Sequence, residues 1–213
     1  MLYIAGLVLY LTMDDMADAN LPSGVSLVDG IVNQALHSDG SGGGILSQGQ
    51  VPAQSCLVTT GGCEQGVTFA VWVKYEENGS RQEEFCVVTR WANFVKIYKK
   101  HNRFLVVFGA VKKAEVNLNN VCKLSEWCHV AIMWDPFIGR VSFYNNGEIF
   151  ESQRPVKNQG NPLPINQMYI GTGTNGNAKR GRCFIDELYV WTKAQNATFV
   201  SSLFQQYGRG NDA

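Results

Sequence analysis

The sequence predicts an all-β domain, a sandwich or barrel of antiparallel strands with one short helix near the C-terminal end. Three observations predict this class. Short runs of alternating or β-branched and aromatic residues recur along almost the whole chain. Residues that favour turns separate these runs. Helical spacing is confined to Ala194–Gln206, through Phe199, Leu203 and Phe204. Strands this dense, with turns between them, are typical of sandwiches and barrels.

The clearest pair of strands lies between residues 126 and 148. Residues 129–134 alternate valine, isoleucine and tryptophan with other residues, which is the period of a strand with one buried face. A turn over 135–139, with the sequence Asp-Pro-Phe-Ile-Gly, leads into a second strand over 141–144. The dipeptide Asn146-Gly147 then favours a hairpin turn.

The remaining strands follow from similar runs, bounded by glycine, asparagine, aspartate and proline. We read the apolar N-terminal run as a first strand over 6–13, and we expect any signal peptide to lie upstream of Met1. In chain order, the other expected strands cover residues 35–37, 44–46, 68–75, 85–89, 94–98, 104–108, 115–118, 168–171 and 184–191.

Composition limits the partners. The chain has 213 residues and 45% apolar content, enough for one core, so we expect a single domain over residues 1–213. Its formal net charge is zero, so no overall field attracts nucleic acid or an anionic membrane. The apolar run over residues 1–11 is shorter than the roughly 20 residues that cross a bilayer. We therefore expect no nucleic-acid partner and no membrane insertion of this segment.

Six cysteines in an all-β chain indicate three disulfides and an oxidising compartment. Two pairs are close enough in sequence to close local loops, which leaves one long-range link. The expected pairs are Cys56–Cys63, Cys122–Cys128 and Cys86–Cys183. The alternative is that some of these residues are buried free thiols of a cytosolic protein.

Two sequences for N-linked glycosylation point to the same compartment. They are Asn78-Gly79-Ser80, in a polar turn, and Asn196-Ala197-Thr198, after the last strand. The motif is short and arises by chance, so each site alone is weak support. Together with the cysteines, they predict an extracellular location, either secreted or in the ectodomain of a membrane protein.

Five motifs in order resemble laminin G-like and pentraxin-like jelly-roll domains of the concanavalin-like superfamily. The resemblance covers about residues 6–206 and implies an antiparallel jelly-roll sandwich of two sheets, with a short C-terminal helix. The motifs that carry it are Leu36–Gly42, Val67–Val73, the Trp-x-His-Val hairpin over 126–148, Tyr169–Gly171 and Gly181–Trp191.

The resemblance makes calcium the cofactor to consider. It implies ligands at Asp39, in an Asp-Gly-Ser-Gly turn, and at Asp186, in Ile-Asp-Glu-Leu. Calcium takes 6–8 oxygen ligands, so backbone carbonyls and water would complete the set. The alternative is structural, with Asp39 capping a turn and Asp186 accepting backbone N–H bonds.

A basic segment gives a second candidate site. Residues 85–114 contain no aspartate or glutamate, and a hairpin gathers several cations there. A polyanion such as a sulfated glycosaminoglycan would bind such cations by multivalent contacts. Alternatively, lysines on an edge strand prevent aggregation. The cations expected to bind are Lys96, Lys99, Lys100 and Arg103.

Catalysis has little support. Glycosidases of this superfamily need two carboxylates across a cleft, whereas Glu76-Glu77 and Glu83-Glu84 lie in a turn without that spacing. We therefore expect no enzyme. The expected function is an extracellular recognition or adhesion module, part of a larger secreted or membrane-anchored protein. Its ligand is expected to be a matrix or cell-surface glycan, glycosaminoglycan or protein. The alternatives are a calcium-dependent carbohydrate lectin and, third, a glycoside hydrolase.

Overall fold

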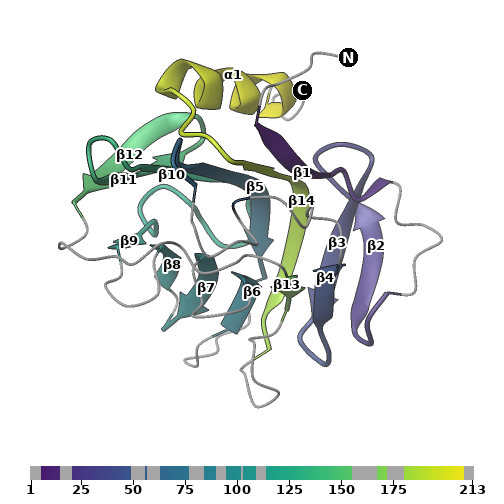
Figure 1. The fold of residues 1–213 in the computed structure, drawn as a ribbon. Coiled ribbons are helices and arrows are strands. Elements are labelled where there is room, and N and C mark those ends of the chain that lie inside the picture. The colour runs from purple at the N-terminus through teal and green to yellow at the C-terminus, as the bar shows by residue number, and fades with distance from the viewer. Residues whose placement is uncertain are drawn as a thin grey trace.

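A computed structural model shows two antiparallel sheets packed face to face, with one helix on the outer side of the larger sheet (Figure 1). The predicted fold class, an antiparallel jelly-roll sandwich, is confirmed. The structure describes residues 6–14, 21–48, 56, 63–76, 84–89, 95–101, 103–108, 114–154, 167–171 and 180–208.

Within the described residues the larger sheet has eight strands, with β1 (Leu7–Leu11) pairing with β14 beside the main path. In spatial order the path is β12 (Glu148–Gln153), β11 (Arg140–Asn145), β10 (Cys128–Asp135), β5 (Val67–Tyr75), β14 (Arg182–Trp191), β3 (Gln34–Asp39) and β2 (Val25–Asp29).

The smaller sheet has six strands in the part of the chain that the structure describes. Their order is β4 (Gly44–Gln48), β13 (Gln167–Ile170), β6 (Glu84–Thr89), β7 (Val95–Lys100), β8 (Arg103–Phe108) and β9 (Ala114–Asn117).

The core lies between the two sheets, and on β10 it follows the predicted alternation. On β5, Val67, Phe69, Val71 and Val73 point into it, and on β10 the inward residues include Val130. These side chains are almost fully buried. The strands with the strongest alternation therefore form the centre of the sandwich.

Helix α1 (Ala197–Gly208) covers one end of the larger sheet's outer face, as Figure 1 shows. Its Val200 and Leu203 pack with Ala70, Tyr189 and Trp191 of the sheet. Both faces of β5 are consequently buried over most of the strand. No helix among the described residues is long and apolar enough to cross a membrane.

Three disulfides join the cysteines in the pairs that the sequence analysis expected. Cys86–Cys183 links β6 to β14 and so ties the two sheets together across the core. The other two close local loops, Cys56–Cys63 and Cys122–Cys128.

Candidate functional site

The predicted basic hairpin exists, but its four cations do not share a surface. Strands β7 and β8 pair with Lys100 opposite Arg103. Because side chains alternate along a strand, Lys96 and Lys100 face outward while Lys99 faces the other sheet. Lys99 is 0% exposed, whereas Arg103 is exposed.

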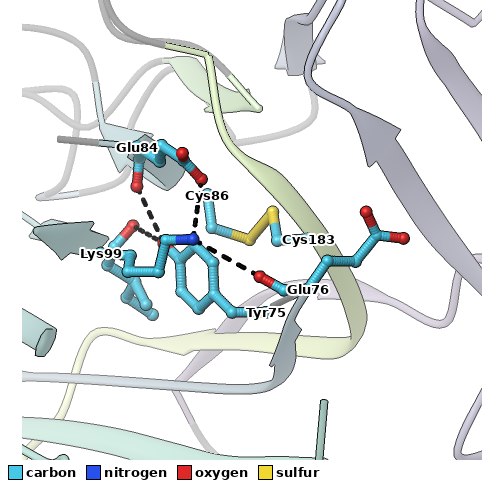
Figure 2. Close-up of polar contacts among 7 residues, drawn as sticks. Tyr75, Glu76, Glu84, Cys86, Lys99 and Cys183 are labelled. Atoms are coloured by element: carbon cyan, nitrogen blue, oxygen red, sulfur yellow. Dashed lines mark hydrogen bonds and ion pairs between the residues drawn. A yellow bond between two sulfur atoms is a disulfide. The ribbon is translucent and has the colours of Figure 1, made fainter. Parts of the chain in front are cut away.

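The prediction that Lys99 binds a polyanion is therefore wrong. Its ammonium lies 3.2 Å from Glu84 Oε2 and donates to the backbone oxygen of Glu76 at 3.4 Å (Figure 2). The hydroxyl of Tyr75 lies in the same buried cluster and donates to the backbone oxygens of Glu84 and Ile97. A buried charge needs a partner, and Glu84 supplies it. Polyanion binding through Lys96, Lys100 and Arg103 stays a prediction.

The two aspartates predicted to bind calcium lie on neighbouring strands, but they are well separated. Arg182 is the register partner of Asp39, and Asp186 lies four residues further along β14. At ~3.3 Å per residue, this places the two about 13 Å apart along the strands, too far to hold one ion. In the described part of the chain, no group of three or more His, Cys, Asp or Glu residues is placed to hold a metal.

Each aspartate makes the contacts expected from the structural alternative to calcium binding. Asp39 Oδ1 accepts the backbone N–H of Ser41 at 2.7 Å within the turn. The carboxylate of Asp186 is buried and accepts the N–H groups of Ile31, Val32 and Glu187 at 2.8–3.1 Å. Burial raises the pKa of Asp186 to about 7. Calcium binding stays a prediction.

Of the two glycosylation sequences, Asn196 is exposed at the start of α1. Its side-chain oxygen accepts the N–H of Phe199 at 2.8 Å, which caps the helix. Asn78 lies outside the described residues.

A cluster that the sequence analysis did not identify crosses the outer face of the larger sheet. We call it the outer row, and it consists of Trp127, Lys74, Phe184 and His37. Phe184 of β14 has Lys74 of β5 as its register partner on one side and His37 of β3 on the other. Trp127 precedes β10, and its ring contacts both Lys74 and Phe184. All four side chains are half-buried.

The outer row places a cation over two aromatic rings, Trp127 and Phe184, which pack edge to face with their centroids 6.1 Å apart. The ammonium of Lys74 lies 4.1 Å from the centroid of Phe184 and 5.0 Å from that of Trp127. On the other side of Phe184, His37 stacks at 4.3 Å. Partial burial lowers the pKa of Lys74, and the nearby charge of Glu76 acts in the opposite direction. Cation–π contacts offset part of the lost hydration and fix the ammonium in place.

A carboxylate completes the arrangement. Oε1 of Glu76 lies 3.2 Å from Nε2 of His37. Two backbone contacts hold Glu76, because its N–H donates to the backbone oxygen of Arg182 and its carbonyl accepts from the ammonium of the buried Lys99. The buried ion pair in Figure 2 therefore helps to position an acceptor at the surface.

Two constraints hold Trp127 beside β5. The disulfide Cys122–Cys128 closes the loop that carries Trp127. In that loop, the N–H of Ser125 donates to the backbone oxygen of Tyr75 at 2.7 Å. Helix α1 packs on Trp72 through Phe204, whereas Lys74 lies two residues further along β5. The outer row thus lies on the part of the larger sheet's outer face that is beyond the contact between Trp72 and α1. Together with the adjacent carboxylate of Glu76, it offers a cation and aromatic surface to one ligand.

A model of the concanavalin A-like lectin/glucanases superfamily matches residues 47–201, which is more than half of the 213-residue chain. The chain belongs to this superfamily. The laminin G-like resemblance is thereby confirmed. A comparison with curated proteins finds no match.

Solved structures share this concanavalin A-like fold at low identity. The binding domain of Paraclostridial Mosquitocidal Protein 1 gives a TM-score of 0.71 at 16% identity, covering 95% of this chain and 52% of that chain. The receptor binding domain of botulinum neurotoxin C/D mosaic serotype gives 0.70 at 15%, covering 94% and 51%. The ligand binding domain of botulinum neurotoxin serotype D in complex with N-acetylneuraminic acid gives 0.66 at 14%, covering 87% and 45%. This chain spans about half the length of these structures, and at such identity the likeness shows the fold alone.

Proposed function

We propose that this concanavalin A-like domain is an extracellular recognition module that binds a glycan bearing an acidic group at the outer row. The observation that carries the proposal is the ammonium of Lys74, held against the edge-to-face rings of Trp127 and Phe184. A carboxylate or sulfate on a sugar would pair with this ammonium. Sugar hydroxyls would donate to Glu76, and the apolar face of a sugar ring would lie against the aromatic edges.

Preorganisation is the physical reason to expect useful affinity there. A single exposed ion pair contributes only ~0–1 kcal/mol, so one mobile lysine would bind an acidic sugar weakly. Lys74 is partly desolvated and flanked by rings, so binding immobilises less of the side chain. Glu76, which His37 holds beside the row, has a partly exposed side chain and could contact the same ligand.

Three disulfides support the extracellular placement, because such bonds persist in oxidising compartments. One structural neighbour was solved in complex with N-acetylneuraminic acid, a sugar that carries a carboxylate. We propose binding without catalysis. Glu84 is neutralised by Lys99 and Glu76 lies against His37, so these two carboxylates do not face each other across a cleft.

A glycan array that pairs acidic sugars with neutral counterparts tests the proposal, with and without a calcium chelator. We expect wild-type protein to bind acidic sugars selectively. Removing the charge-assisted contact in Lys74→Met should weaken binding about tenfold or more. Trp127→Ala should weaken it as well.

The matched control is Lys123→Met, because Lys123 lies in the same loop as Trp127 but is exposed and pairs with Glu126. Circular dichroism establishes that each variant is folded. Equal binding of neutral and acidic sugars, or full binding by Lys74→Met, would rule out the outer row as the acidic-glycan site. Loss of binding in the chelator would support the calcium-dependent lectin instead.

A further inference from the structure

Helix α1 is exposed to solvent along one side, yet none of its residues is charged. Its sequence is Ala-Thr-Phe-Val-Ser-Ser-Leu-Phe-Gln-Gln-Tyr-Gly. Surface helices usually carry charged residues on the side that faces water. Here Thr198, Ser201, Ser202 and Gln205 recur at the spacing of one helical face and present only hydroxyl and amide groups.

This face forms one wall of a groove of about 600 Å³. Gly147, Glu148 and Ile149 of the β11–β12 hairpin form the other wall. Ile149 is 57% exposed and offers an apolar surface, and Glu148 is an exposed acceptor beside it. Among the described residues, no lysine or arginine lines the groove, which suits an uncharged, hydroxyl-rich ligand.

A glycosylation sequence leads directly into the groove. Asn196 is exposed, and the next two residues of its sequence, Ala197 and Thr198, line the groove. The helix cap uses Oδ1 of Asn196 and not Nδ2, the atom that carries a sugar. Asn196 is two residues from Thr198, and consecutive Cα atoms are ~3.8 Å apart. A first sugar attached to Asn196 is therefore near the groove.

We propose that Asn196 carries an N-linked glycan and that the groove between α1 and β12 holds its first, uncharged N-acetylglucosamine residues. In the modification, Nδ2 loses a proton and forms a bond to C1 of the sugar. The C1–oxygen bond to the diphosphate of a polyprenyl-diphosphate oligosaccharide donor breaks. The sugar hydroxyls and acetamide then pair with the hydroxyl and amide groups of α1 and with Glu148, while Ile149 packs on the ring. This inference rests on the extracellular placement proposed above but not on the outer row.

The test uses the full chain secreted from cells that add N-glycans, with site occupancy read by mass spectrometry of peptides. Asn78 is the internal reference. We expect Asn196 to be occupied. We also expect an endoglycosidase to release its glycan severalfold more slowly than the glycan of Asn78 in the native protein, and equally fast after denaturation. Ile149→Asp should leave Asn196 occupied but make its glycan as easy to release as that of Asn78.

Two further variants separate the glycan from the helix cap. Asn196→Asp keeps a strong capping residue and removes the modification, so its Tm should fall by a few degrees. Thr198→Ser keeps both the glycosylation sequence and the hydroxyl, so it should behave as wild type. An unmodified Asn196, or a glycan released as readily as that of Asn78 with no change in Tm, would overturn the proposal. Binding of free chitobiose to Asn196→Asp, with wild-type Asn196 unmodified, would assign the groove to a free sugar instead. Sugar binding at the outer row is measured separately, so failure here leaves that proposal standing.

Discussion

Lys99 and Lys100 are neighbours in the sequence, yet β7 turns their side chains to opposite faces of the smaller sheet. Alternation alone predicts that one of the two faces inward. It does not predict that Glu84 compensates the buried charge of Lys99, because that depends on the strand register that sets Glu84 opposite Lys99. The same argument places Lys74 outward on a strand whose other residues are almost all buried.

Removing one partner of the buried pair should be costly. We expect Lys99→Met to lower the free energy of unfolding by about 3–5 kcal/mol, because Glu84 would remain buried without a compensating charge. The double variant Lys99→Met/Glu84→Gln should recover much of this loss. Urea denaturation followed by fluorescence measures both.

The control is the exposed pair Lys123–Glu126, where Lys123→Met should change the free energy by no more than ~1 kcal/mol. A Lys99→Met variant as stable as this control would show that the buried pair adds nothing.

At the scale of elements, β14 connects several parts of the larger sheet through a bulge. The register shifts between Asp186 and Tyr189, and Glu187 has a φ of 48°. Asp186 holds the turn between β2 and β3. The carboxylate of Glu187 accepts the hydroxyls of Tyr10 and Tyr189 at 2.8 and 2.6 Å. Two adjacent buried carboxylates thus fix β1 and the β2–β3 turn against β14.

This arrangement predicts a pH dependence of stability. Burial raises the pKa of Asp186 from 3.8 to about 7, and burial also raises the pKa of Glu187. Between these pH values the folded state binds more protons than the unfolded state, so the free energy of unfolding falls as pH rises. The contribution is present in full below the unfolded pKa and is lost above about pH 7. We expect Asp186→Asn to flatten this slope in thermal melts recorded between about pH 4 and pH 8. Superimposable pH profiles for the variant and the wild type would contradict the assignment.

The sequence predicted individual strands and the helix better than it predicted which strands lie side by side. Alternation identified β10, runs of β-branched and aromatic residues identified β5 and β11, and the helix was placed within three residues at each end. The edge strands β2 and β12 were missed because their side chains are mostly exposed or half-buried, which leaves little apolar pattern. The outer row could not be predicted from the sequence for a different reason. Its residues come from four segments, and only the order β10-β5-β14-β3 brings them together.

For the whole molecule, the link between the sheets is the disulfide Cys86–Cys183. Each cysteine is 0% exposed, and the bond joins residues 97 positions apart. It also closes the part of the chain that carries the hairpin of β7 and β8, β10 and β11. Cross-linking restricts the unfolded chain more when the closed loop is longer.

We therefore expect the variant Cys86→Ala/Cys183→Ala to lose about 4–5 kcal/mol of unfolding free energy in the chain-entropy model, with a further loss from the cavity left by the buried sulfurs. The variant Cys56→Ala/Cys63→Ala, which opens a loop with a separation of only 7, should lose about 2–3 kcal/mol. Guanidinium denaturation without reductant gives both values. A local pair that costs as much as the long-range pair would show that native contacts, and not the restriction of the unfolded chain, set the contribution of these bonds. Since the outer row draws on β3, β5 and β14, weakened ties between the sheets should also reduce glycan binding in the first variant but not in the second.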